Sequence, residues 1–81
     1  MDLFLSARFD QSLRAAPQEV QHAFWKQAEF LVSSLNHPSL RAKKYQGATD
    51  VWQARVNRSW RFYFKIIGGA YYLVDITMHP K

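Results

Sequence analysis

The sequence predicts a single α+β domain, residues 1–81, in which two helices cover one face of an antiparallel sheet. Two observations lead to this fold class. Residues 51–78 contain runs of aromatic and β-branched residues separated by Gly68-Gly69, which is typical of strands joined by a tight turn, because glycine reaches positive φ without steric cost. Residues 18–35 repeat apolar side chains at intervals of three and four, which indicates an amphipathic helix.

The chain begins with a short apolar run at residues 2–5, which we expect to form a strand. Ser6 is a suitable N-cap for a helix over about residues 7–15, in which Phe9 and Leu13 lie four residues apart on one face. Pro17 fits the first position of a second helix, because its fixed φ suits a helix start.

The second helix carries an apolar stripe wide enough to cover a sheet. Asn36-His37-Pro38 ends this helix, since proline disfavours helical geometry in the residue before it. A loop over residues 36–42 follows, and residues 46–50 form a turn into the first strand of the C-terminal sheet. The stripe consists of Val20, Ala23, Phe24, Ala28, Phe30, Leu31 and Leu35.

Residues 51–57, 60–67 and 70–78 are predicted to form a three-stranded antiparallel meander, which the N-terminal strand joins at its edge or in its middle. Side chains alternate between the two faces of a strand, so each run divides into two sets. One face is apolar and is covered by the helices: Trp52, Ala54, Val56, Trp60, Phe62, Phe64, Ile66, Tyr72, Val74, Ile76 and Met78. The opposite face is the candidate for chemistry, with Arg55, Arg61, Tyr63, Lys65, Tyr71 and His79.

The composition favours a polyanionic or acidic partner, although many small proteins are basic without binding nucleic acid. Eleven Lys and Arg against six Asp and Glu give a net charge of +5, and the basic residues concentrate between Arg41 and Lys65. The absence of cysteine excludes disulfides and thiolate metal sites. The N-terminus has no secretory leader pattern and no run approaches the roughly 20 apolar residues of a membrane span, so we expect a soluble, cytoplasmic protein.

Arg55 and Arg61 lie on neighbouring predicted strands and face the same way, which suits them to grip a phosphate and stabilise charge developing on it. The alternative is a pair of solvated strand residues, bonded to Asp75 across the sheet. His79 ends the last strand on the same face and is a candidate general acid or base, although a histidine near a terminus is often only an exposed residue.

Tyr63 and Tyr71 are candidates for stacking on bases, with edge-on packing as the alternative. Lys43 and Lys44 are ordinary loop cations or extend a track for a nucleic-acid backbone. The carboxylates do not cluster, His22 and His37 lie far apart, and there is no glycine-rich phosphate loop. We therefore expect no metal and no nucleotide cofactor.

The order of elements, strand-helix-helix-strand-strand-strand, resembles that of the RelE/ParE superfamily of bacterial type II toxins. Four segments carry the resemblance: His37-Pro38-Ser39-Leu40-Arg41-Ala42-Lys43-Lys44, Val51-Trp52-Gln53-Ala54-Arg55-Val56, Trp60-Arg61-Phe62-Tyr63-Phe64 and Asp75-Ile76-Thr77-Met78-His79-Pro80-Lys81. The resemblance implies a RelE-like α+β fold. RelE-like members are ribosome-dependent endoribonucleases that cut mRNA, ParE-like members inhibit DNA gyrase, and both are neutralised by a small antitoxin.

By this resemblance Arg61 matches the most recurrent strand arginine, Arg55 matches a position that is often Lys or Arg, and His79 falls where several members have a histidine. These three residues are the predicted catalytic residues. The residues predicted to bind RNA are Lys43, Lys44, Gln53, Tyr63, Lys65 and Lys81.

The leading hypothesis is an mRNA endonuclease that works by metal-free transesterification and is neutralised by a small acidic antitoxin. The alternative is a gyrase inhibitor, or an inactive relic that only binds its antitoxin. Two features favour the alternative: Gln53 stands where some nucleases have lysine, and the chain ends two residues after His79, without the C-terminal tyrosine and helix of some nucleases.

Overall fold

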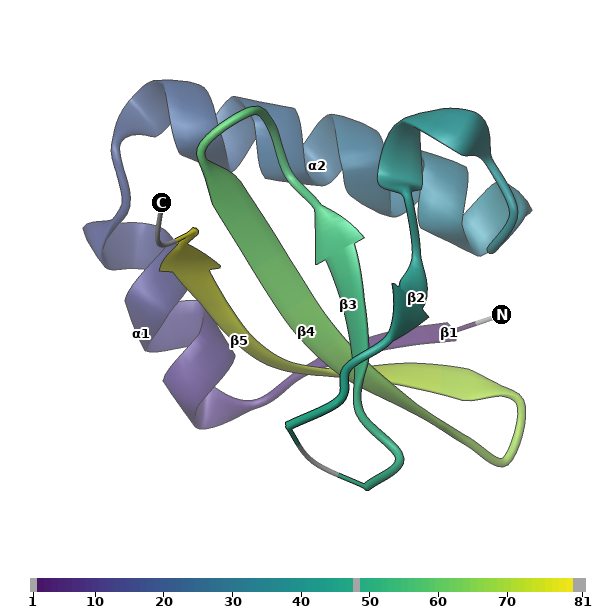
Figure 1. The fold of residues 1–81 in the computed structure, drawn as a ribbon. Helices are drawn as coiled ribbons and strands as arrows, with labels where there is room; N and C mark the ends of the chain where they lie inside the picture. Colours follow the sequence, from purple (N-terminus) through teal and green to yellow (C-terminus); the bar gives the residue numbers. More distant parts are fainter. Residues whose placement is uncertain (1, 48, 80–81) are drawn as a thin grey trace.

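A computed structural model describes residues 2–47 and 49–79 (Figure 1). The elements follow the predicted order, with one short strand and one short 3-10 helix added between the second helix and the meander. Along the chain they are β1 (Asp2–Leu5), α1 (Ala7–Ala15), α2 (Gln18–Ser33), the 3-10 helix η1 (Pro38–Leu40), β2 (Lys43–Lys44), β3 (Trp52–Arg55), β4 (Trp60–Ile67) and β5 (Ala70–Met78).

The strands form one mixed sheet in the order β1-β5-β4-β3-β2. β3, β4 and β5 make the predicted antiparallel meander, and β1 joins its edge in parallel with β5. Both helices lie on one side of the sheet, so the hydrophobic core lies between helices and sheet (Figure 1). The other face of the meander is left uncovered by helices.

Ser6 caps α1 as predicted, because its Oγ accepts a hydrogen bond from the backbone N–H of Phe9 at 3.0 Å. Phe9 and Leu13 are both buried. The ring of Phe9 packs against that of Phe24 in α2, with centroids 5.0 Å apart. Full burial of a side chain of this size contributes about 1.5–3 kcal/mol, so this contact ties the two helices together.

The sequence predicted Pro17 as the first helical residue of α2. In the structure it is the N-cap. Its φ of −53° suits a helix, but its ψ of 147° is extended, so the helix starts one residue later. The predicted stripe faces the core, with Val20, Phe24, Ala28 and Leu31 buried.

No helix in the described part of the chain is long and apolar enough to cross a membrane.

The loop after α2 is more structured than predicted. His37 Nδ1 accepts a hydrogen bond from the N–H of Ser39 at 3.2 Å, which caps η1, and Leu40 is fully buried. The strand β2 was not predicted, because two residues are too few to show an alternating pattern. Its register pairs Lys43 with Gln53 and Lys44 with Trp52.

Gly68 and Gly69 form the turn between β4 and β5, with φ of 56° and 78° as the sequence predicted. This hairpin extends beyond the helices (Figure 1). Ile66 therefore remains 37% exposed although it alternates with the buried Phe62 and Phe64.

The predicted faces are correct for β3 and β4 but wrong for the first half of β5. Tyr63 pairs with Asp75 while the next residue, Phe64, pairs with Leu73, so Val74 is an extra residue in a β-bulge. A bulge reverses the alternation of side chains on one side of it. Consequently Tyr71 and Leu73 are buried, in place of the predicted Tyr72 and Val74. Met78 was also predicted to be apolar core, and it is 64% exposed.

Candidate functional site

The face of the meander opposite the helices carries the predicted arginine pair. Arg55 in β3 and Arg61 in β4 are direct cross-strand partners, and Gln53 is the partner of Tyr63. Side chains at paired positions of neighbouring strands project to the same face, about 5 Å apart at Cβ. The two guanidinium groups therefore start from adjacent positions, as predicted.

These residues line a shallow depression of about 220 Å³. Its side chains come from β2, β3 and β4, from the residue that follows β5, and from the segment between η1 and β2. It is lined by Arg41, Lys43, Gln53, Arg55, Arg61 and His79.

The turn between β3 and β4 holds both strand arginines. The backbone oxygen of Asn57 accepts hydrogen bonds from Arg55 Nε at 3.2 Å and from an Arg61 terminal nitrogen at 2.8 Å, and Trp60 O accepts from the same Arg61 nitrogen at 2.9 Å. Asn57 Oδ1 in turn accepts from the N–H of Ser59 and of Trp60, at 2.9 and 3.0 Å, which fixes the turn. The arginines are thus positioned by carbonyls, which leaves their positive charge uncompensated.

No carboxylate among the described residues forms an ion pair with either arginine. Asp75, the acid considered as their partner, instead pairs with Arg8 of α1, 3.2 Å from Arg8 Nε to Asp75 Oδ2. Burial lowers the pKa of Arg61, the neighbouring charge of Arg55 lowers it further, and Arg41 adds to this effect against an opposite influence of Tyr63. A bound anion would relieve this repulsion.

His79 lies just after β5 and is exposed. Its backbone N–H donates to the carbonyl of Ser59 at 2.6 Å, which holds the chain end beside the turn that positions the arginines. The structure therefore brings the three predicted catalytic residues to one depression. No group of three His, Asp or Glu side chains in residues 2–47 and 49–79 is placed to hold a metal ion.

Arg41 also lines the depression, although the sequence did not predict it as a site residue. It adopts a left-handed conformation, φ 47° and ψ 42°, directly after the buried Leu40. Its place at the start of the basic segment, two residues before Lys43, was the available signal.

The predicted RNA-binding residues do not all lie together. Lys43, Gln53 and Tyr63 lie on the face of the depression. Lys44 alternates to the other face, where its Nζ lies 5.6 Å from the ring centre of Trp52. Lys44 and Lys65 line a separate depression near the β4–β5 hairpin, and Lys81 lies outside the described residues.

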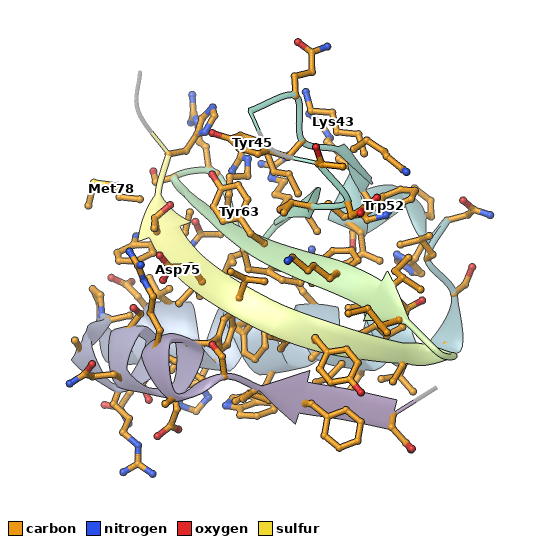
Figure 2. All side chains as sticks on the ribbon, turned by 90° about the horizontal axis from the view of Figure 1, so that it is seen from below. Lys43, Tyr45, Trp52, Tyr63, Asp75 and Met78 are labelled. Atoms are coloured by element: carbon orange, nitrogen blue, oxygen red, sulfur yellow. The ribbon has the colours of Figure 1, made fainter. Side chains whose placement is uncertain are left out.

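Tyr71 does not belong to this face, because the bulge in β5 turns its side chain into the core, where it is 3% exposed. The hypothesis that Tyr71 stacks on bases was therefore wrong. Tyr63 remains, and a second tyrosine not predicted, Tyr45, packs edge-on against it with ring centroids 5.2 Å apart (Figure 2).

No family model matches the sequence, and no curated protein is significantly similar to it. Solved structures do match. The YoeB/ParE toxin from Agrobacterium tumefaciens superposes with a TM-score of 0.80 at 10% identity, covering 99% of this chain and 100% of that chain. A chain of the RelB-RelE antitoxin-toxin complex from Methanococcus jannaschii gives a TM-score of 0.77 at 17% identity, covering 93% and 88%. The isolated E. coli RelE toxin gives 0.77 at 14% identity, covering 99% and 85%. The chain has the α+β fold of these toxins, as the resemblance predicted.

Proposed function

We propose that this chain, which has the fold of the RelE and ParE toxins, is the toxin of a toxin-antitoxin system and an endoribonuclease that cuts mRNA on the ribosome, in the cytoplasm. One observation carries the proposal. Arg41, Lys43, Arg55, Arg61 and His79 meet around one depression, and among the described residues no carboxylate neutralises the arginines.

Arg55 and Arg61 bind the scissile phosphate through the nitrogens that the Asn57 turn leaves free. Because their other nitrogens are already fixed by carbonyls, little side-chain freedom remains to be lost on binding. Arg41 and Lys43 add charge at the rim, where the neighbouring phosphates of an RNA strand pass.

The reaction is a transesterification. The ribose 2′-oxygen forms a bond to phosphorus while the bond from phosphorus to the 5′-oxygen breaks, which leaves a 2′,3′-cyclic phosphate and a 5′-hydroxyl. Arg55 and Arg61 stabilise the extra negative charge on the phosphoryl oxygens in the transition state. His79 takes the proton from the 2′-hydroxyl or gives one to the leaving 5′-oxygen.

The other predicted contacts are distributed along the RNA. Gln53 lines the depression, its cross-strand partner Tyr63 lies next to it, and both contact the nucleotide at the cleaved bond. Lys65 contacts the strand or the ribosome near the hairpin, and Lys44 contacts the strand between the hairpin and the arginines. Lys81 remains a predicted RNA contact.

The test replaces Arg61 by alanine and expresses the protein alone in bacteria. Removing one donor to a transition-state charge typically costs about 10²- to 10³-fold in rate, so Arg61→Ala should stop growth inhibition and reduce discrete cuts in ribosome-bound mRNA. Arg14→Ala is the matched control, because Arg14 is an exposed arginine paired with Asp10 on α1. If the folded Arg61→Ala protein cleaved mRNA as the wild type does, the nuclease proposal would be wrong.

The same cultures test the alternative of a gyrase inhibitor. The observation that favours it is Gln53, a neutral residue among the basic side chains that line the depression. Loss of plasmid supercoiling with intact transcripts would support gyrase inhibition. Intact transcripts, unchanged supercoiling and normal growth would support an inactive protein that only binds an antitoxin.

The partner that we propose is a small acidic antitoxin whose segment folds on this chain. The net charge of +5 favours its approach. Trp25 and Val32 of α2, 47% and 44% exposed, border a mostly apolar hollow of about 390 Å³. Leu3, Ala28 and one acidic residue, Glu29, complete its lining, and the apolar side chains offer anchors for the apolar side of such a segment. The RelB-RelE complex of the same fold supports this choice of partner.

A further inference from the structure

Tyr45 lies beside the basic depression and takes no part in the proposed phosphate chemistry. It is 40% exposed although it is aromatic. It follows β2 directly, and its backbone N–H donates to the carbonyl of Val51 at 2.8 Å, so the residue is held at the entrance to β3. The ring is therefore exposed although its backbone is held in place.

Two neighbours determine where the ring of Tyr45 lies. Tyr63 packs edge-on against it at an interplanar angle of 70°, with centroids 5.2 Å apart. Gly47 lies close beneath the ring, and a Cβ atom at this position would lie 2.6 Å from a ring carbon of Tyr45. A side chain at position 47 would therefore push the ring out of this position. An exposed ring that is held in this way needs little further ordering to accept a flat ligand.

The ring also adjoins the phosphate site. Tyr45 lines a second depression of about 250 Å³ with Lys43, Lys44, Gln46 and Gln53. Lys43 and Gln53 line the arginine depression as well, so the two depressions lie next to each other. The first contains the arginines for a phosphate, and the second adds an aromatic ring and the amide of Gln46 to the shared Lys43 and Gln53 and to Lys44.

We propose that the second depression is a nucleobase subsite, in which an unpaired base next to the bound phosphate stacks on Tyr45. This inference rests on the proposed RNA-cleaving function. Bases have π faces whatever their identity, so stacking binds any base, while the amides of Gln46 and Gln53 are placed to hydrogen-bond its edge. Tyr45 thus orients the nucleotide whose phosphate Arg55 and Arg61 hold.

The test measures binding of short single-stranded RNA by fluorescence anisotropy at low ionic strength. The RNA is 2′-O-methylated throughout, which removes the attacking hydroxyl and prevents cleavage. Tyr45→Ala should weaken binding by about 5- to 150-fold, the range for loss of one base-aromatic stack, and Tyr45→Phe should bind as the wild type does. Tyr72→Ala is the matched control, because Tyr72 is 39% exposed but stacks on Phe4 away from both depressions.

A second series places one abasic nucleotide at each position of the RNA in turn. At one position the missing base should weaken binding of the RNA to the wild type. In Tyr45→Ala the missing base at that position should cause no further loss of affinity, since the base and the ring act on each other. Suppose that the wild type binds RNA and that Arg61→Ala weakens this binding. If Tyr45→Ala then binds RNA as tightly as the wild type, or if Tyr72→Ala weakens binding as much as Tyr45→Ala does, the subsite is refuted and the proposed function stands. If the wild type does not bind RNA, the subsite is refuted, and the cleavage of ribosome-bound mRNA still decides the proposed function.

Discussion

Gln27 of α2 is the polar side chain on which the geometry of the basic depression depends, and replacing it should destabilise the whole domain. It is only 7% exposed, the one buried polar or charged residue in the described part of the chain. Its Nε2 donates to the carbonyls of Arg55 at 2.7 Å and Ser39 at 2.9 Å, and its Oε1 accepts from Ser39 Oγ at 2.9 Å. Gln27 thus joins the helix layer to β3 and to the segment that precedes Arg41.

The change that isolates these bonds is Gln27→Met, which keeps the length of the side chain and removes the amide. Three hydrogen bonds are lost at about 1 kcal/mol each, and the carbonyls left behind are part-buried, so we expect a loss of about 3 kcal/mol in the free energy of unfolding. For a domain of this size that corresponds to a fall of roughly 12–24 °C in Tm. The domain should still fold, because small domains have about 5 kcal/mol or more to lose.

Urea unfolding followed by tryptophan fluorescence and by circular dichroism measures the loss. Gln21→Met is the matched control: Gln21 Nε2 donates to Ala16 O at 2.9 Å and Arg14 O at 3.4 Å, but Gln21 is half-buried and water can replace its amide. We expect less than about 1 kcal/mol there. Equal losses for Gln27→Met and Gln21→Met would show that burial does not set the strength of these bonds, and would refute the reasoning.

Burial raises the pKa of Tyr71 above its ordinary value of 10.0, so its contribution to stability is complete below pH 10 and is lost as pH rises through the folded-state pKa. In urea titrations above pH 10, the unfolding free energy should therefore fall less steeply with pH for Tyr71→Phe than for the wild type, whereas Tyr72→Phe, at an exposed position, should not change this slope. Equal slopes of unfolding free energy against pH for the two variants would contradict this. Gly69→Ala should cost about 1–2 kcal/mol in thermal unfolding, from its φ of 78° alone, since no atom lies within 4 Å of the added Cβ; an unchanged Tm would argue against strain in the turn. Raising salt should slow stopped-flow association with the antitoxin more than it speeds dissociation, whereas Trp25→Ala should mainly speed dissociation; salt-independent association would exclude electrostatic steering.

Local signals in the sequence predicted the elements well, because each depends on a few adjacent residues. Ser6 forms its cap through a bond to a residue three positions away, and Gly68-Gly69 forms the turn through its own φ angles. The start of α2 was missed by one residue, since the φ of Pro17 allows both a helical and an extended ψ.

The face assignment failed where the pairing between strands, and not the pattern within one strand, decides it. Tyr71, Tyr72, Leu73 and Val74 are all good strand residues, so the sequence carries no local mark of the extra residue in β5. The bulge is fixed by the register in which Tyr63 meets Asp75 and Phe64 meets Leu73. Its consequence is that Tyr71 packs in the core and not on a base.

By itself, the sequence determined the α+β class, the order of elements and the cross-strand pair Arg55 and Arg61, because alternation and chain order are local properties. Only the tertiary structure decided which charges share one site. Arg41 enters the depression because a buried Leu40 and the bonds of Gln27 fix the segment before it, and Lys44 leaves it because β2 pairs with β3 in one register. Contacts between residues distant in the chain set these positions, and a pattern read along one strand or helix does not contain them.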